Sequence, residues 1–301
     1  QMSVSNSESI IFFHKTFGVK RFVLARECSL EDIKTIQKDL KKILGARSSD
    51  IEIEVFAHGA MCVSISGRCF MSEYSFGRSA NRGECIQPCR REYLVKDKDD
   101  GSEFILGEDY VMSPKDICTL PFIEKLIEAE VSSFKIEGRD RSPEYVGTVT
   151  SCYRKAVDHY FQNRRKKDFA KGFKELKKEL LKDVERVYNR GFSSGFFLGR
   201  PIGEWTKICG SQASTRKEYL GLIKNYYKRL KVAEVKLQTG ELKKGDEIMF
   251  QGPTTGVVSQ TAGSMEIEHK KVDAAEKGSL IAIKTEKPLR RNDKLYIVRK
   301  R

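Results

Sequence analysis

Four of the eight cysteines in this chain lie in one segment, at Cys62, Cys69, Cys85 and Cys89. Disulfides are rare in a reducing compartment, so such a dense group of cysteines points to a bound metal. Four thiolates can hold either a zinc ion or an iron–sulfur cluster. Zinc sites usually take cysteines roughly two to four residues apart, a spacing that only Cys85 and Cys89 have. The wider gap between Cys62 and Cys69 favours a loop that surrounds an iron–sulfur cluster.

A third alternative is that these thiols bind nothing, because free cysteines often pack as small buried hydrophobes. The surrounding segment is rich in glycine, serine and arginine, which gives it little apolar material with which to bury four thiols. We therefore expect the four cysteines to be metal ligands, with an iron–sulfur cluster as the first alternative and zinc as the second. Cys118 is a candidate substitute for Cys89 as the fourth ligand.

Three further residues could take part in acid–base chemistry: His58, Glu54 and Glu137 lie at or just after the ends of predicted strands. In a parallel α/β barrel, the carboxyl ends of the strands form the face where active sites gather. Histidine titrates near neutral pH, so His58 could act as a general acid or base. The alternative is a hydrogen-bonded histidine of the core.

Arginines lie in comparable positions. A guanidinium group matches the geometry of a carboxylate, so Arg26, Arg68 and Arg139 could bind a small dicarboxylate. Each could instead form a structural salt bridge, as Arg139 could with Glu137 or Asp140. Both interpretations stay open at this stage.

The first two thirds of the chain must position these residues. Helical periodicity and capping residues predict helices over residues 8–17, 29–44, 113–130 and 143–161, and apolar or alternating runs predict strands over residues 1–5, 19–24, 51–56 and 133–136. Alternating strands and helices indicate a parallel α/β sheet. A closed barrel of this type needs eight strand–helix units, and about four are visible here. The pattern fits either an open sheet or part of a larger barrel.

The last third has a different pattern. From about residue 210, short strands alternate with turns that contain glycine and aspartate, which predicts a small antiparallel β-barrel. We expect one domain over residues 1–205, which carries the cysteine group, and a second over residues 206–301. Residues 162–182 form a basic helical stretch, which suits either a solvated helix face or an RNA-binding surface.

The chain has 56 Lys and Arg against 42 Asp and Glu, a formal net charge of +14. A positive field favours polyanionic partners such as nucleic acid, although a lysine-rich proteome would give the same charge. The sequence has no apolar run long enough for a membrane span and no signal peptide. We expect a cytoplasmic protein without a membrane partner.

Several segments carry a recognisable signature: residues 54–62 (Glu-Val-Phe-Ala-His-Gly-Ala-Met-Cys), 66–72, 82–90, 135–139 (Lys-Ile-Glu-Gly-Arg) and 189–192 (Asn-Arg-Gly-Phe). Through them the chain resembles the peptidase U32 family of collagenase-like proteins over nearly its whole length. Within that family it looks most like the branch that hydroxylates the wobble uridine of tRNA with prephenate.

This resemblance implies a TIM-like barrel, a 4Fe-4S cluster on cysteines, and a carboxy-terminal β-barrel similar to domain 2 of elongation factor Tu. It implies tRNA or another RNA and a prephenate-like dicarboxylate as partners. It also implies that about the first third of the family's usual chain is absent here. We therefore expect a second copy or an amino-terminal partner segment to cover the exposed edge of the sheet.

Three functions are compatible with these features. The first is a prephenate-dependent, iron–sulfur tRNA hydroxylase. The second is a metal-dependent collagenase-like peptidase, although the sequence contains neither an HExxH nor a Gly-x-Ser-x-Gly motif. The third is a non-catalytic RNA-binding module.

Overall fold

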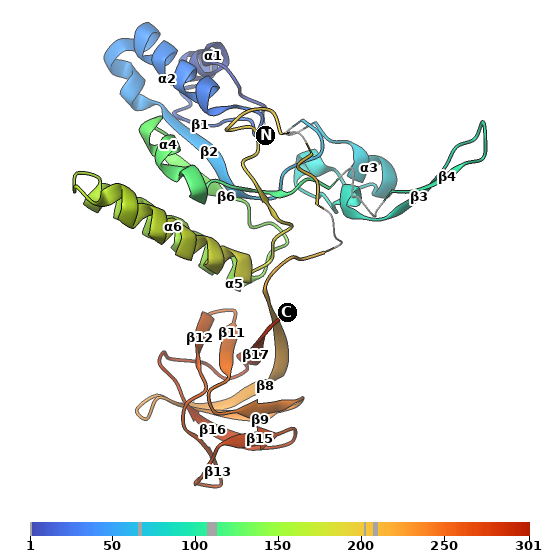
Figure 1. Ribbon diagram of the computed structural model, residues 1–301, viewed down its shortest axis with the longest axis vertical. Helices are drawn as coiled ribbons and strands as arrows, with labels where there is room; N and C mark the ends of the chain where they lie inside the picture. The colour runs from blue at the N-terminus through green and yellow to red at the C-terminus, as the bar shows by residue number, and fades with distance from the viewer. Residues whose placement is uncertain (1, 66–67, 107–112, 202, 207–209) are drawn as a thin grey trace. The chain divides into compact units, whose positions relative to one another are not determined.

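The computed structural model describes residues 2–65, 68–106, 113–201, 203–206 and 210–301 (Figure 1). Residues 66–67 of the U32-like signature therefore lie outside the described part of the chain. The fold divides into two compact units. The first comprises residues 1–141 and 148–212, and the second comprises residues 142–147 and 213–301.

A mixed five-stranded sheet organises the first unit. Strand β2 (Glu52–Gly59) pairs in parallel with β1 (Arg21–Val23) and β6 (Ser133–Ile136). Strand β5 (Asp116–Cys118) runs antiparallel to the end of β2 and pairs in parallel with β7 (Phe192–Ser193). The expected parallel strand pairs around β2 are confirmed. Across the ranges given above, however, the strands do not close into a barrel.

The principal helices of this unit are α1 (Ser7–Phe17), α2 (Leu30–Leu44), α4 (Ile123–Glu128), α6 (Phe169–Arg186) and, from residue 148 onward, α5 (Pro143–Asn163). Ser29 and Asp32 form the predicted capping box at the start of α2, each side chain accepting a hydrogen bond from the other's backbone N–H. The apolar face of α2 packs into a core with Ile53 and Val55 of β2. This packing fixes β2, whose end leads into the cysteine segment.

The predicted helix over residues 113–130 is wrong in its first part, because Asp116–Cys118 is strand β5. Ser113 and Asp116 resemble a capping pair in the sequence, but both side chains bind arginines. The Ser113 hydroxyl accepts a hydrogen bond from Arg90, and the Asp116 carboxylate accepts one from the backbone N–H of Arg190. The predicted strand over residues 1–5 is likewise reduced to a single bridge between Val4 and Leu24.

The cysteine segment lies between β2 and β5 and consists of short elements. They are α3 (Met71–Phe76), the 3₁₀ turns Ala80–Arg82 and Pro88–Arg90, and the hairpin of β3 (Tyr93–Lys96) and β4 (Glu103–Leu106). Two further 3₁₀ turns, Gly45–Asp50 and Leu120–Phe122, precede β2 and α4.

The second unit is antiparallel throughout, as predicted. Its eight-stranded sheet has the order β12-β11-β17-β8-β9-β16-β13-β14, and β10 and β15 form a separate pair. The strands are β8 (Thr215–Tyr227), β9 (Val232–Leu237), β10 (Glu241–Lys243), β11 (Glu247–Gly252), β12 (Gly256–Thr261), β13 (Met265–Ile267), β14 (Lys270–Val272), β15 (Ala274–Glu276), β16 (Leu280–Lys284) and β17 (Lys294–Lys300). Within its described residues, no pairing joins β12 to β14, so the predicted closure into a barrel is not observed.

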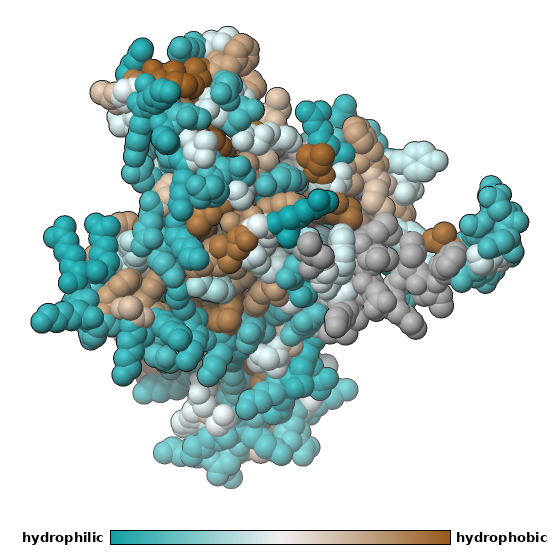
Figure 2. All heavy atoms as spheres, turned by 45° about the horizontal axis from the view of Figure 1, so that its top comes forward, coloured by the Kyte–Doolittle hydropathy of each residue, from teal (hydrophilic) through white to brown (hydrophobic). Residues whose placement is uncertain are grey.

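Figure 2 shows mostly hydrophilic residues on the face drawn, with hydrophobic residues in separate patches. Among the residues that the structure describes, no helix combines the length and the apolar character that a membrane crossing requires.

Candidate thiolate centre

The structure brings the four cysteines of the segment to one cavity. Cys62, Cys69, Cys85 and Cys89 all line a pocket of about 120 Å³. Cys62 follows the end of β2, Cys69 precedes α3, Cys85 precedes the turn Pro88–Arg90, and Cys89 lies in that turn. Residues far apart in the segment therefore converge on one space.

The pKa values of Cys62 and Cys89 respond both to burial and to the other cysteines of the group. Burial raises the pKa of Cys62, the neighbouring Cys69 and Cys85 act in the same direction, and the backbone of Ser64 and the Arg26 cation oppose them. Burial also raises the pKa of Cys89, while the Arg90 cation lowers it and the other three cysteines raise it. Because thiolates are the metal-binding form, a metal would have to displace protons from these groups.

The donor set suits either of the two expected groups, because four cysteines can hold a zinc ion or a [4Fe–4S] cluster. Across the described residues, no group of three or more His, Cys, Asp or Glu side chains already stands in an arrangement that could hold a metal ion. The four thiols line one cavity, so a bound group would draw them closer together.

The loop that carries Cys85 and Cys89 is held by local hydrogen bonds. Ser72 of α3 accepts a hydrogen bond from the backbone N–H of Ile86 at 3.1 Å. The Tyr93 hydroxyl donates to the carbonyl of Pro88 at 2.8 Å. Between them Gln87 has φ +57°, a left-handed conformation that is unfavourable for a residue with a side chain. The turn is thus held in a specific conformation.

Arg26 and Glu137 separate this cavity from a second one of about 280 Å³, since both residues line both cavities. Arg26 donates a hydrogen bond to Glu137 at 3.2 Å, and its guanidinium carbon lies 3.5 Å from the centre of the Phe56 ring. The Arg26 side chain is only 8% exposed, and its Nε has no hydrogen-bond partner among the described residues. A buried N–H donor without a partner is costly.

The other two candidate arginines differ in position. Arg139 is exposed and lines both cavities, and its backbone N–H donates to Glu137 at 3.2 Å. Arg68 is also exposed, but it is not among the described residues that line either cavity. Of the three candidate arginines, Arg26 and Arg139 thus line both cavities.

The absence of a side chain at Gly59 allows Glu137 to lie close to the end of β2. Its φ of +116° is one that L-residues rarely adopt, and a Cβ there would lie 2.7 Å from the Cβ of Glu137 and 2.8 Å from its carbonyl oxygen. The end of β2 therefore approaches the residue after β6 more closely than any side chain would allow.

His58 and Glu54 lie outside the described linings of both cavities. His58 is 2% exposed and contacts the rings of Tyr153 and Phe192. Burial lowers the pKa of His58 to about 3, with a smaller effect from the Arg141 cation. The imidazole is therefore neutral at neutral pH, which favours the interpretation as a core histidine. Glu54 accepts a hydrogen bond from Ser133 and pairs with Lys135.

Cys118 is buried in β5, and burial raises its pKa to about 12. It does not appear among the described residues around the four-cysteine cavity. This placement favours Cys89 over Cys118 as the fourth ligand.

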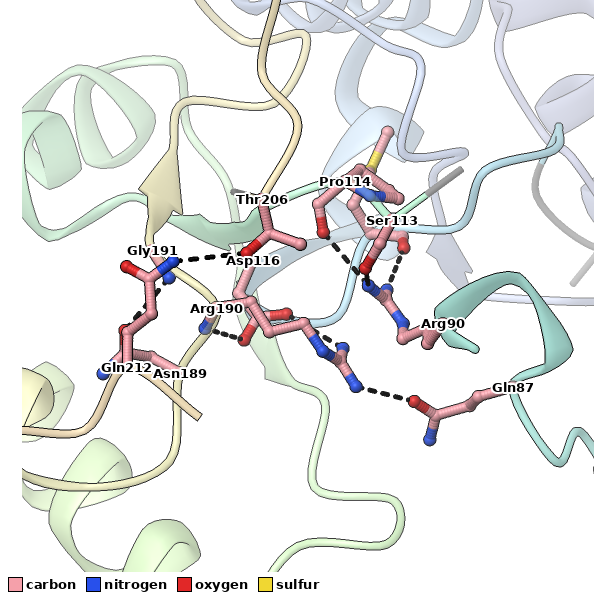
Figure 3. Close-up of polar contacts among 11 residues, drawn as sticks. Gln87, Arg90, Ser113, Pro114, Asp116, Asn189, Arg190, Gly191, Thr206 and Gln212 are labelled. Atoms are coloured by element: carbon pink, nitrogen blue, oxygen red, sulfur yellow. Dashed lines mark hydrogen bonds and ion pairs between the residues drawn. The ribbon is translucent and has the colours of Figure 1, made fainter. Parts of the chain in front are cut away.

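Sequence reasoning missed a network of buried charges beside the cavity (Figure 3). Arg190 is 7% exposed and Asp116 1% exposed, and their closest charged atoms lie 3.6 Å apart. Burial raises the pKa of Asp116, while Arg190, Arg141 and Arg90 oppose that effect. Arg90 and Arg190 both lie in segments of the family signature, and that was the sequence signal that could have singled them out. The position of Asp116 beside them follows only from the fold.

The comparisons with known proteins agree on one family for this chain. The model of peptidase family U32 matches residues 1–207. A collagenase of Porphyromonas gingivalis strain W83 is 42% identical over 100% of this chain and 71% of its own length. An uncharacterized protease of Methanocaldococcus jannaschii is 40% identical over 99% of this chain and 71% of its own length.

A tRNA hydroxylation protein, P1 of Bacillus subtilis, is 36% identical over 84% of this chain and 57% of its own length. The named tRNA hydroxylation protein is therefore a more distant and more partial match than the collagenase and the protease. The family model and these identities together show that the chain belongs to peptidase family U32.

Proposed function

We propose that the chain is the cluster-binding part of an enzyme that hydroxylates the wobble uridine of tRNA in a prephenate-dependent reaction. The observation that carries this proposal is the single cavity lined by Cys62, Cys69, Cys85 and Cys89. Four cysteines of this kind would hold a [4Fe–4S] cluster, which supplies one-electron redox chemistry when bound. Hydroxylation is an oxidation, so a redox group suits it better than it suits peptide hydrolysis.

The neighbouring residues would bind the carboxylate substrate. Arg26 and Arg139 line the second cavity together with Lys135, which gives it three cationic side chains beside the carboxylate of Glu137. The Arg26 guanidinium, which lines this cavity and lies over the Phe56 ring, would attract a substrate carboxylate. A prephenate-like dicarboxylate carries two negative charges, which would complement the positive charges of Arg26 and Arg139.

The proposed RNA substrate is supported by charge. The net charge of +14 would attract the tRNA phosphates. The tRNA hydroxylation protein of B. subtilis is a relative at 36% identity, which supports the same reaction class.

A second candidate function is a collagenase-like peptidase, and the similarity findings favour it over the first. The relatives that match nearly the whole chain carry the names collagenase and protease. Its weakness is chemical: the most prominent histidine of the site region, His58, is buried and has a pKa of about 3.

One pair of assays separates these candidates. Nucleoside mass spectrometry of tRNA from cells lacking the gene should show loss of the hydroxylated wobble uridine. Wild-type protein should restore it, as should the control variant Cys152→Ala, whereas Cys62→Ala should not. Cleavage of gelatin by the purified full-length protein, together with unchanged tRNA in the deletion strain, would instead establish the peptidase.

A further inference from the structure

Two arginines connect the cysteine-bearing segments to the sheet (Figure 3). Arg90 directly follows Cys89, and its guanidinium donates to the carbonyl of Met61 at 2.7 Å. Met61 directly precedes Cys62. The same guanidinium donates to the Ser113 hydroxyl at 2.9 Å and to the Pro114 carbonyl at 3.1 Å. One side chain therefore ties the loop of Cys89 both to the segment of Cys62 and to the chain that enters β5.

Arg190 supports the same loop from another side. Its Nη2 donates to the side-chain carbonyl of Gln87 at 2.9 Å. Gln87 lies in the turn between Cys85 and Cys89 and has the unfavourable φ of +57°. The Arg190 contact therefore holds a turn whose backbone conformation is costly when left to itself.

Asp116 anchors Arg190 in turn. Its carboxylate accepts a hydrogen bond from the backbone N–H of Arg190 at 3.2 Å and lies 3.6 Å from Nη1 of the guanidinium. Asp116 is the first residue of β5, and β5 pairs with the end of β2, the strand that leads to Cys62. The supporting side chains are thus fixed to the same sheet that positions the first ligand.

The charges of this network are unequal. Arg190, Arg141 and Arg90 bring three guanidinium cations near the single carboxylate of Asp116, and among the described residues Asp116 Oδ1 and Arg190 Nη1 lack hydrogen-bond partners. Burying charged groups is costly, and a buried ion pair adds little stability compared with an apolar core. Such a network is therefore better explained by the geometry it imposes than by the stability it adds.

We infer that Arg190 is a positioning residue that holds the Cys85–Cys89 turn in place before a cluster binds, while Arg90 joins that turn to the segment of Cys62. This inference rests on the proposed cluster on the four cysteines. Partners that orient metal ligands without touching the metal typically change metal affinity by about 10–100-fold when they are removed. Arg190 contacts the turn through its hydrogen bond with Gln87, so removal of either side chain should loosen the same turn.

The test uses Gln87→Gly and Arg190→Gln in the full chain. Each protein is reconstituted anaerobically with ferrous iron and sulfide, and the rate at which a chelator removes the iron is measured. We expect about 10–100-fold faster loss in each variant, and no further acceleration when Gln87→Gly is added to Arg190→Gln, because Arg190→Gln already removes their contact. Gln87→Gly should lower the unfolding midpoint less than Arg190→Gln, because glycine adopts φ +57° freely and this gain offsets part of the cost of leaving Arg190 Nη2 without its acceptor. That result would separate positioning from a general loss of stability.

Lys177→Gln is the matched control, since Lys177 also binds a backbone carbonyl and a carboxylate, those of Pro121 and Glu124. It should lose iron at the wild-type rate. Wild-type rates in both Gln87→Gly and Arg190→Gln would overturn the inference while leaving the cluster in place. A wild-type protein that retains no iron would overturn the proposed cluster together with the inference.

Discussion

Replacing Gly59 by alanine tests how the end of β2 sets the site. A Cβ at this position would lie 2.7 Å from the Cβ of Glu137 and 2.8 Å from its carbonyl oxygen, where one of the atoms is backbone and cannot rotate away. The two strand ends would have to separate. Glu137 would move with its strand, and its hydrogen bond with Arg26 would lengthen or break.

Two costs add in this variant. A residue with a side chain at positive φ costs roughly 1–2 kcal/mol, and overpacking of a tight site costs roughly 1–3 kcal/mol. We therefore expect Gly59→Ala to lower the free energy of unfolding of the first unit by about 2–5 kcal/mol. Urea unfolding followed by far-ultraviolet circular dichroism would measure it, because the principal helices lie mostly in the first unit.

Gly18→Ala is the control that isolates the steric contact. Gly18 also has a positive φ, +68°, but a Cβ there would meet nothing within 4 Å. It should cost only the conformational part, about 1–2 kcal/mol. Equal losses in the two variants would show that the approach of Gly59 to Glu137 does not constrain the fold, and the reasoning would fail.

Three further predictions concern the residues around the site. Tyr153→Phe removes a buried hydroxyl that donates to the carbonyl of Ala57 at 2.7 Å and accepts a hydrogen bond from a backbone N–H; urea unfolding should show a loss of about 1–3 kcal/mol. Because the folded chain lowers the pKa of His58 from 6.5 to about 3, the unfolded chain binds the proton first as the pH falls. The contribution of His58 to stability is therefore complete above pH 6.5 and is lost below it, by up to about 1.4 kcal/mol per pH unit; His58→Gln, compared with wild type in unfolding titrations, should lack this part of the slope. Arg26→Met keeps a long side chain against Phe56 but removes the charge, so calorimetry should show about 10–100-fold weaker binding of a small dicarboxylate, and an unchanged affinity would contradict the proposed carboxylate site.

Local patterns in the sequence predicted much of the scaffold. The capping pair Ser29 and Asp32 and the alternating run that became β2 involve neighbours in sequence, so their pattern is sufficient to define them. The same logic failed at Ser113 and Asp116. There the side chains bind Arg90 and Arg190, which are distant in sequence, and no local rule contains that information.

The candidate site was predictable where residue type alone carries the chemistry. Cysteine density pointed to Cys62, Cys69, Cys85 and Cys89, and the structure places all four around one cavity. The position of His58 after an alternating strand did not reveal that Tyr153 and Phe192 would enclose it. Burial depends on elements contributed from elsewhere in the chain, so the lowered pKa could be obtained only from the fold.

The most direct test of the central claim is the content of iron and acid-labile sulfide in protein purified without oxygen. If the four cysteines together hold one cluster, the wild-type protein should contain about four of each per chain, and Cys62→Ala should lose both. Cys118→Ala should retain them, because Cys118 is buried in β5 and is not among the described residues that line the cavity. A wild-type protein without iron, or a Cys62→Ala variant with the full amount, would contradict the account.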